Sequence, residues 1–202
     1  MELFEALHTQ RAIRRFKPDP VPDELVRRVL DAAIRAPSGG NSQPWVFLVL
    51  KDADVKNRVG AFYKQGWDHS GLSSLATDPD PSRARVYSSA SYLSERMGEA
   101  PVLILVCVRG SGGRVSVTSG SSIYPAVQNL MLAARGLGLG TVLTTVHRHR
   151  ETEIKELLGI PKDVDTVALV PMGCPAEGAR FGPTSRRPLE EVAFRDKWGQ
   201  AF

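Results

Sequence analysis

Cysteine is scarce in this sequence, and long apolar runs are missing. Cys107 and Cys174 are its two cysteines, and both lie in apolar, strand-like stretches, which favours reduced core thiols over a disulfide framework. No apolar run approaches the ~20 residues that a membrane helix needs. The N-terminal segment carries Glu2 and Glu5 and has no basic stretch before an apolar one, so we expect no secretory signal. These absences predict a soluble protein of the cytoplasm.

Runs of one charge and the common catalytic signatures are also missing. The net charge of +4 comes from dispersed arginines, and no basic run is interleaved with aromatics, so we expect no nucleic-acid partner and no membrane partner. Neither a GxSxG elbow nor a GxxxxGK[ST] loop occurs, and no side chain stands out as a nucleophile or base. The glycines at 136, 138 and 140 follow an expected helix and precede an expected strand, the reverse of a dinucleotide-binding turn.

Metal binding has little support. His147 and His149 are the only closely spaced histidines, and two ligands do not make a site, so we interpret both as surface residues of a strand end.

Length and composition are those of one globular domain, covering residues 1–202. Apolar periodicity and turn signals predict an α+β fold with a sheet of at least four strands and a core helix. Helices are expected at 2–9, 23–36, 53–65, 83–97, 121–135 and 150–158. Strands are expected at 45–50, 101–108, 141–146 and 166–173.

Several of these expectations are specific. The run at 45–50 is continuous and apolar, which predicts a strand buried on both faces, with Trp45 in the core. Residues 66–82 are rich in Gly, Ser, Asp and Pro and are expected to form a surface loop, the start of a candidate lid at 66–98. Residues 109–120 are expected to be a loop. The helix after it is expected to begin at the serines 121 and 122 and to be covered on nearly all sides.

Two arginine clusters suggest an anionic ligand. Arg11, Arg14 and Arg15 follow the first helix, and Arg186 and Arg187 lie in the basic tail at 182–202. A guanidinium group suits bidentate contact with a phosphate. Because no protein nucleophile is evident, a bound cofactor that brings its own reactive atom is one interpretation of these clusters. Two solvated surface patches are the other.

Four motifs in order tie these observations together: "TQRAIRRFKPDPVP", "APSGGNSQPWVFLVL", "PAVQNLMLAARGLGLGTVLTT" and "RRPLEEV". With their separations they resemble the nitroreductase family of flavoproteins, from Leu3 to about Val192 except for the variable middle. The resemblance implies a homodimer with a mostly antiparallel sheet of four to five strands around a core helix. It also implies FMN bound between the two chains.

The resemblance also implies roles for single residues. Arg11 matches the position that holds the phosphate and ribityl side of FMN, Arg14 matches the cation beside N1 and O2 of the flavin, and Arg186, or else Arg187, matches the tail contact to the phosphate. The loop laid against the flavin by the partner matches Pro37, Ser38, Gly39, Gly40 and Asn41, with Gln43 fixing it. Thr144 and Thr145 match the strand at the flavin edge, with Thr145 expected to donate to N5.

Two positions depart from the common pattern, since Gln10 replaces a basic residue and Ala12 replaces a serine. Backbone contact to FMN at Ala12 is still expected.

The implied reaction is ping-pong hydride transfer, in which NADH or NADPH reduces FMN and a nitroaromatic, a quinone or an activated alkene is then reduced. Iodotyrosine deiodinases and the flavin-destroying enzymes of cobalamin synthesis are less favoured relatives. The deiodinases use a set of Glu, Tyr and Lys that is not found between residues 60 and 100 of this sequence. The flavin-destroying enzymes place Asp where this sequence has Ala12. A non-enzymatic flavin-binding protein on the same fold is the alternative from another class.

Overall fold

A computed structural model describes residues 1–110 and 116–202 of the chain. The strands in these residues form one sheet of order β1-β2-β4-β3, and every neighbouring pair is antiparallel. The strands are β1 (Trp45–Leu50), β2 (Val102–Arg109), β3 (Gly140–Thr141) and β4 (Val164–Gly173). The expected α+β fold with a four-stranded antiparallel sheet is therefore confirmed.

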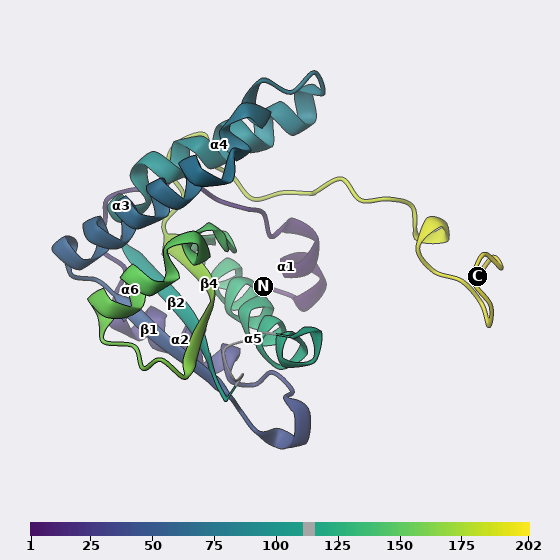
Figure 1. The fold of residues 1–202 in the computed structure, drawn as a ribbon. Helices are drawn as coiled ribbons and strands as arrows, with labels where there is room; N and C mark the ends of the chain where they lie inside the picture. The colour runs from purple at the N-terminus through teal and green to yellow at the C-terminus, as the bar shows by residue number, and fades with distance from the viewer. Residues whose placement is uncertain (111–115) are drawn as a thin grey trace.

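Helices cover both faces of this sheet (Figure 1). They are α1 (Leu3–Thr9), α2 (Asp23–Ala33), α3 (Ala53–Ser70), α4 (Pro81–Arg96), α5 (Val117–Gly136) and α6 (Glu151–Leu158). Short 3₁₀ turns are η1 (Gly39–Asn41), η2 (Leu72–Thr77), η3 (Met97–Glu99), η4 (Val146–Arg150) and η5 (Leu189–Glu191). Helices α2 and α5 pack on one face of the sheet, and α3, α4 and α6 pack on the other.

Strand β2 shows why the core has two halves. Val102 and Ile104 pack with α2 and α5, whereas Leu103 and Leu105 pack with the residues of α3, α4 and α6. Side chains alternate between the faces of a strand, so a continuous apolar run suits a strand that is covered on both sides. Burying each of these side chains stabilises the fold by about 1.5–3 kcal/mol.

Helix α2 begins and packs as its sequence predicts. Pro22 precedes it, Asp23 and Glu24 stand in its first turn near the positive end of its dipole, and Val26 and Val29 are buried in the core. The periodic apolar stripe therefore positions α2 against α5.

Strand β1 differs from its prediction because it is an edge strand. Among residues 1–110 and 116–202 it pairs only with β2. Val49 is exposed, and the residues from Trp45 to Leu48 are half-buried. The expectation of burial on both faces is wrong for this chain, since helices cover β1 less fully than they cover β2 and β4. Trp45 does pack against the core as expected.

The expected loop at 66–82 is largely helical. Helix α3 continues to Ser70, η2 follows, and α4 begins at Pro81 with Asp80 as its N-cap. Trp67 is 4% exposed, so its burial carries the helix through a polar stretch. A Cβ at Gly66 would lie 2.7 Å from the Val146 carbonyl oxygen, so this glycine permits close packing rather than a turn.

The prediction of a strand at 141–146 is also mostly wrong. Strand β3 ends at Thr141, and only an isolated bridge between Thr144 and Leu169 continues its direction. Thr145, with φ −130° and ψ −1°, then leaves the extended conformation and leads into η4. The ladder cannot continue past this residue.

Helix α5 begins before its predicted start. Ser116 is its N-cap and forms a capping box with Ser119, so residues 117–120 are helical rather than loop. The part of the expected 109–120 loop at 111–115 lies outside the described residues. Tyr124 and Gln128 form an exposed stripe, so the helix is not covered on nearly all sides within this chain.

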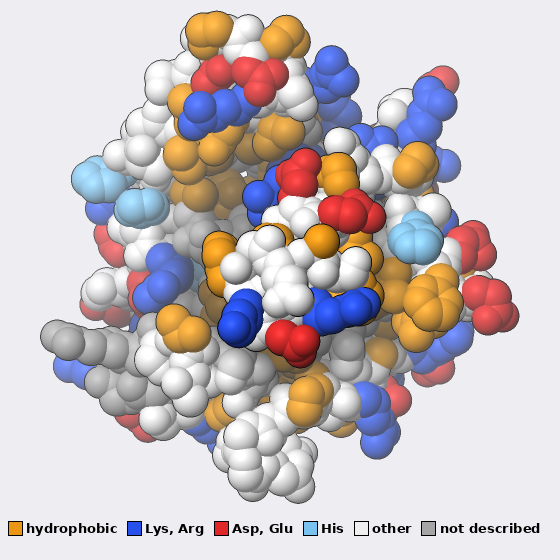
Figure 2. All heavy atoms as spheres, turned by 90° about the vertical axis from the view of Figure 1, so that its right-hand side faces the viewer, with side chains coloured by type: hydrophobic (Ala, Val, Ile, Leu, Met, Phe, Trp, Pro, Cys, Tyr) orange, Lys and Arg blue, Asp and Glu red, His pale blue; other side chains and the backbone are white. Residues whose placement is uncertain are grey.

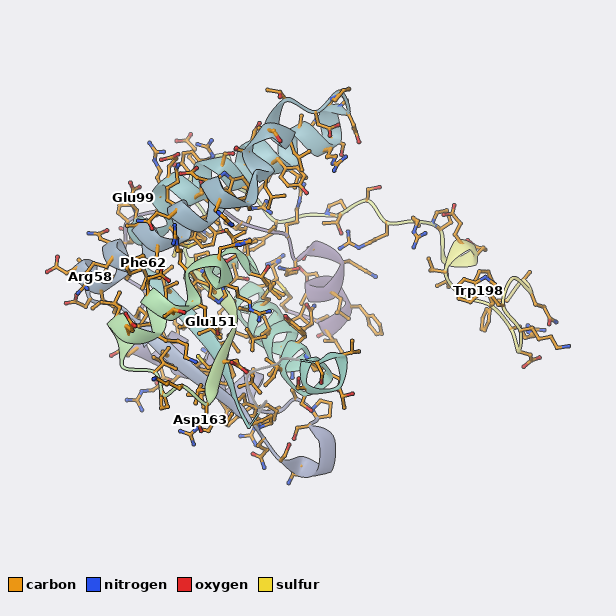
Figure 3. All side chains as sticks on the ribbon, viewed as in Figure 1. Arg58, Phe62, Glu99, Glu151, Asp163 and Trp198 are labelled. Atoms are coloured by element: carbon orange, nitrogen blue, oxygen red, sulfur yellow. The ribbon has the colours of Figure 1, made fainter. Side chains whose placement is uncertain are left out.

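The C-terminal tail extends away from the folded body and from the sheet (Figure 1). Near its end the rings of Phe194 and Trp198 contact each other in a tilted arrangement, with centroids 5.3 Å apart. Trp198 is 94% exposed and lies far out on this extension (Figure 3).

Candidate functional site: an arginine-lined cavity and a strained loop

The segment after α1 is held along the end of the sheet. The Ile13 amide donates to the Thr141 carbonyl oxygen at 3.0 Å, and the Lys17 amide donates to that of Cys174 at 2.8 Å. Ile13 also lies directly over Gly140. These contacts fix the backbone that carries Arg11, Ala12 and Arg14.

A cavity of about 340 Å³ opens beside this segment. Residues 11–15 form one wall, Arg85, Val86 and Ser89 of α4 form a second, and Gly178, Ala179 and Arg180 form a third. Five arginines therefore face one hollow. The structure brings Arg11, Ala12 and Arg14 together as predicted. Arg85 and Arg180 were missed, since nothing in their own neighbourhoods marks them and only the fold joins them to the first cluster.

Arg14 is half-buried, whereas its neighbours Arg11 and Arg15 are exposed. Burial lowers the pKa of its guanidinium, and the nearby Tyr63 hydroxyl acts in the opposite direction. Burial also raises the pKa of Tyr63, although a hydrogen bond with Thr144 and the charge of Arg14 each lower it. Arginine stays protonated in proteins, so Arg14 is a partly desolvated cation.

No carboxylate neutralises this cluster within the described parts of the chain. The ion pairs found there include none of Arg11, Arg14, Arg15, Arg85 and Arg180. Arg15 instead lies 3.7 Å from the centroid of the Tyr92 ring. Arg14 is the one half-buried cation of the five, and the other four arginines are exposed. Partial removal of a cation from water is costly unless an anion compensates it. Arg14, with four further cations around the same hollow, therefore suits an anionic ligand such as a phosphate.

Thr144 and Thr145 lie at the end of the sheet near Tyr63. The Thr144 hydroxyl donates to the Leu169 carbonyl oxygen at 2.7 Å, and both backbone groups of Thr144 pair with Leu169. Thr145 is exposed. Of the two threonines, Thr145 is therefore the one whose side chain faces solvent.

The loop 37–43 has an unusual backbone. Gly40 has φ 58°, and Asn41 and Gln43 have φ 53° and 46°, in the left-handed region that residues with a Cβ seldom adopt. The Gln43 amide donates to Ser38 Oγ at 3.0 Å, and Gln43 Nε2 donates to Asn41 Oδ1 at 3.2 Å. These two hydrogen bonds tie Gln43 to Ser38 and Asn41 within the loop. Such strain is found most often at functional sites.

This loop lies at a second hollow, of about 690 Å³. The Gly39 amide donates to Ser122 Oγ on α5 at 3.0 Å, and the hollow is also lined by Arg109 and Ser116. The two cavities share no lining residue. Within one chain, then, the structure does not bring the loop 37–43 to the arginine cavity.

The tail arginines are also apart from the arginine cavity. Arg186 and Arg187 are exposed, and Arg186 Nη1 donates to the neighbouring Ser185 carbonyl oxygen at 2.8 Å. Neither lines either of the two hollows.

The histidines do not form a metal centre. His149 is exposed and its ring lies 5.5 Å from that of His69, but His147 is fully buried, so its prediction as a surface residue is wrong. His147 Nε2 contacts Thr166 Oγ1 at 3.2 Å, and Thr166 Oγ1 donates to Glu151 at 2.8 Å. Residues 1–110 and 116–202 contain no group of three possible metal ligands. In the same residues, every helix is too short or too polar to cross a bilayer.

Comparison with known proteins agrees with this geometry. The model of the Nitroreductase family matches residues 7–174. The chain is 30% identical over 179 residues to a provisionally named NADH dehydrogenase/NAD(P)H nitroreductase of Methanothermobacter thermautotrophicus, covering 88% of this chain and 79% of that protein. It is 29% identical over 199 residues to iodotyrosine deiodinase 1 of Rattus norvegicus, covering 95% and 68% of the two chains.

A solved structure shows the same fold. The crystal structure of oxidised iodotyrosine deiodinase bound to FMN and 3-iodo-L-tyrosine matches with a TM-score of 0.73 and 25% identity, over 97% of this chain and 99% of that one. The fold is that of an α+β protein with one antiparallel sheet between two layers of helices. The chain belongs to the nitroreductase family.

Proposed function

We propose that this protein is an FMN-dependent oxidoreductase that uses NADH or NADPH to reduce a nitroaromatic, a quinone or an activated alkene in a ping-pong reaction. The observation that carries the proposal is the cavity with five arginines and no carboxylate partner among the described residues, beside a segment fixed to β3. An anionic cofactor would balance this charge.

Residues from two segments of the chain, 11–14 and the tail, would hold FMN. Arg11 and the backbone at Ala12 suit its phosphate and ribityl side, and Arg14 suits the pyrimidine edge of its ring. Arg186, or else Arg187, would reach the phosphate from the tail, which extends away from the folded body (Figure 1). When bound, FMN supplies hydride acceptance and donation at N5.

The roles of the protein groups follow from their chemistry. Arg14 is a fixed cation, which favours any ligand state that gains negative charge beside it. Thr145, exposed at the start of η4, would donate a hydrogen bond to N5. The end of α3, η2 and α4 form a helical hairpin, which would act as the lid over the acceptor. Residues 1–202 would form one domain.

A homodimer is part of the proposal, because the site is incomplete within one chain. Pro37, Ser38, Gly39, Gly40 and Asn41 lie away from the arginine cavity, so the partner's copy of this loop would complete the site. Exposed apolar side chains support an interface. Leu3 and Phe4 of α1 are 63% and 72% exposed, and Figure 2 shows hydrophobic side chains on the face from which the tail leaves.

Reductive deiodination is a second candidate, favoured by the 29% identity with the rat iodotyrosine deiodinase. In this chain, the part of α4 at the cavity presents Arg85 and Ser89 and no carboxylate. The nitroreductase reaction is therefore preferred. A flavin-binding protein without turnover is the non-enzymatic alternative. Both cysteines are free, in keeping with a reducing compartment such as the cytoplasm.

The decisive experiment starts from the visible spectrum of the purified protein. We expect a yellow protein that NADH or NADPH bleaches without oxygen, and whose colour returns on adding a nitroaromatic or a quinone. Iodide release from 3-iodotyrosine by the reduced protein would favour the deiodinase reaction. A yellow protein that neither nucleotide bleaches would favour the binding protein, and failure to take up added FMN would exclude all three functions.

A further inference from the structure

Positive charge in the arginine cavity exceeds what FMN needs. The proposed function uses Arg11 and Arg14, and Arg15 is engaged by the ring of Tyr92. A phosphate monoester carries about two negative charges near neutral pH, fewer than the five positive charges that line the cavity. Arg85 and Arg180 remain without an assigned partner.

Arg85 is positioned by the packing of α4. Two guanidinium groups contact the ring of Tyr92 on this helix, with Arg15 at 3.7 Å and Arg96 at 4.7 Å from the ring centroid. Arg85, Ser89 and Tyr92 are four and three residues apart, so they follow one face of the helix. The contact of Tyr92 with Arg15 therefore turns Arg85 and Ser89 toward the segment 11–15, and both line the cavity.

Arg180 is positioned by contacts on both sides of it. Before it, the Ala179 amide donates to the Ala176 carbonyl oxygen at 3.0 Å and closes a turn. After it, Phe181 lies under the Arg135 guanidinium, 4.2 Å from the ring centroid, and the Gly182 amide donates to the Thr9 carbonyl oxygen at 3.0 Å. The backbone on either side is fixed, and this places Arg180 at the cavity wall. Like Arg85, Arg180 is exposed, so both guanidinium groups are open to a ligand that enters from solvent.

We propose that Arg85 and Arg180, with the Ser89 hydroxyl, form a second anion-binding site that recognises a carboxylate or phosphate on the substrate exchanging electrons with the flavin. This inference rests on the proposed function. It predicts that the protein prefers anionic substrates over neutral ones of the same shape. The anion has two possible sources, a carboxylate on the acceptor or the 2′-phosphate that distinguishes NADPH from NADH.

Equilibrium binding tests the inference separately from turnover. The oxidised FMN-loaded protein is titrated with 4-nitrobenzoate and with neutral 4-nitrobenzamide, and dissociation constants are taken from the change in flavin absorbance. Wild type should prefer the benzoate. Arg85→Gln and Arg180→Gln should each weaken benzoate binding about five- to tenfold, the loss of one charge-assisted hydrogen bond near the surface, and leave the benzamide unchanged. Arg85→Lys, which keeps the charge, should retain most of the binding.

Arg83→Gln is the matched control. Arg83 lies on the same helix, pairs with Asp78 at 3.2 Å and does not line the cavity, so removing its charge should not alter either dissociation constant. A second arm titrates NADP⁺ and NAD⁺, which cannot reduce the flavin, into the same oxidised proteins. Loss of preference confined to NADP⁺ would assign the site to the electron donor, and loss confined to the benzoate would assign it to the acceptor.

The inference is overturned if the variants keep both preferences, if they weaken charged and neutral ligands equally, or if Arg83→Gln has the same effect. The FMN spectrum and a thermal melt of each variant identify any that fails to fold, in which case the Arg85→Lys comparison decides. Absence of FMN binding in wild type would instead count against the proposed function. Normal reduction without any anion preference would count against this inference alone.

Discussion

Ile13 lies against the face of Gly140, where an added Cβ would come within 2.6 Å of the Ile13 Cγ2 atom. This contact lets the segment that carries the cavity arginines run directly beside β3. The sequence places Gly140 between an expected helix and an expected strand, and the structure shows that its main role is this close approach.

Gly140→Ala should therefore displace residues 11–15 and weaken FMN binding, with a loss of about 1–3 kcal/mol in the free energy of unfolding. Gly136→Ala is the matched control, because nothing lies within 4 Å of an added Cβ there. It should leave stability unchanged or raise it by about 0.5–1 kcal/mol through helix propensity. Urea unfolding and FMN titration measure both effects, and equal behaviour of the two variants would contradict this role for Gly140.

Arg14→Ala should make the bound flavin harder to reduce. Removing a fixed cation disfavours the negative charge gained on reduction, so the two-electron potential should fall by about 30 mV, equivalent to about 1.4 kcal/mol. Reduction by NADH or NADPH should slow accordingly. Arg28→Ala, at an exposed position of α2, serves as the control. An unchanged spectrum, potential and rate would remove Arg14 from the flavin site.

Gln43 and Ser42 provide a paired test of backbone strain in the loop 37–43. Gln43 has φ 46°, so Gln43→Gly should be more stable than Gln43→Ala by about 1 kcal/mol, although both lose the bond to Asn41. Ser42 has φ −69°, so the order should reverse at this position, and Ser42→Ala should be more stable than Ser42→Gly. Thermal unfolding measures all four variants. The same order at both positions would mean that Gln43 is not strained.

His147 should make the protein sensitive to acid. Its burial lowers its pKa to about 3, from an ordinary value of 6.5, with a smaller contribution from Arg148. Between these values the unfolded chain binds a proton that the folded chain does not, so stability falls with falling pH by up to about 1.4 kcal/mol per unit.

His147→Gln should reduce the slope of unfolding free energy against pH by this amount between about pH 6.5 and pH 4. Urea melts across this range provide the measurement. His8→Gln, at an exposed position, should keep the wild-type slope. Parallel curves for wild type and His147→Gln would show that His147 does not account for the acid sensitivity.

Mixed dimers test whether a site is shared between chains. A dimer of one Arg14→Ala chain and one Asn41→Ala chain contains one doubly altered site and one intact site if each site combines the arginine segment of one chain with the loop of the other. Such a dimer, purified with two different tags, should then show about half the wild-type rate of flavin reduction. A rate no higher than those of the two variant homodimers would mean that each chain builds its own site.

Elements with strong local signals could be predicted from the sequence. The apolar period of α2 and its Pro22-Asp23 start, and the continuous apolar run of β2, are confirmed because local pattern and burial agree there. Helix α3 was predicted too short because Trp67 stabilises its last turns through tertiary burial, which a Gly- and Ser-rich sequence does not reveal.

The candidate site could be predicted only in part for the same reason. Arg11 and Arg14 are neighbours in sequence and carry a motif, so the sequence identifies them. Arg85 and Arg180 join the cavity through the packing of α4 and the turn before Phe181, which no short-range pattern encodes. The backbone strain at Asn41 and Gln43 likewise depends on the side-chain bonds that hold the loop.

The two thiols of the chain differ in a way that gives the protein an internal reporter. Cys107, in the middle of β2, is fully buried, and burial raises its pKa to about 12, whereas Cys174 is half-buried after β4. A thiol reagent needs both access and the thiolate. Labelling of Cys107 therefore requires the sheet itself to open, so its rate follows the rare opening of the core, and Cys174 records only motion at the sheet's end.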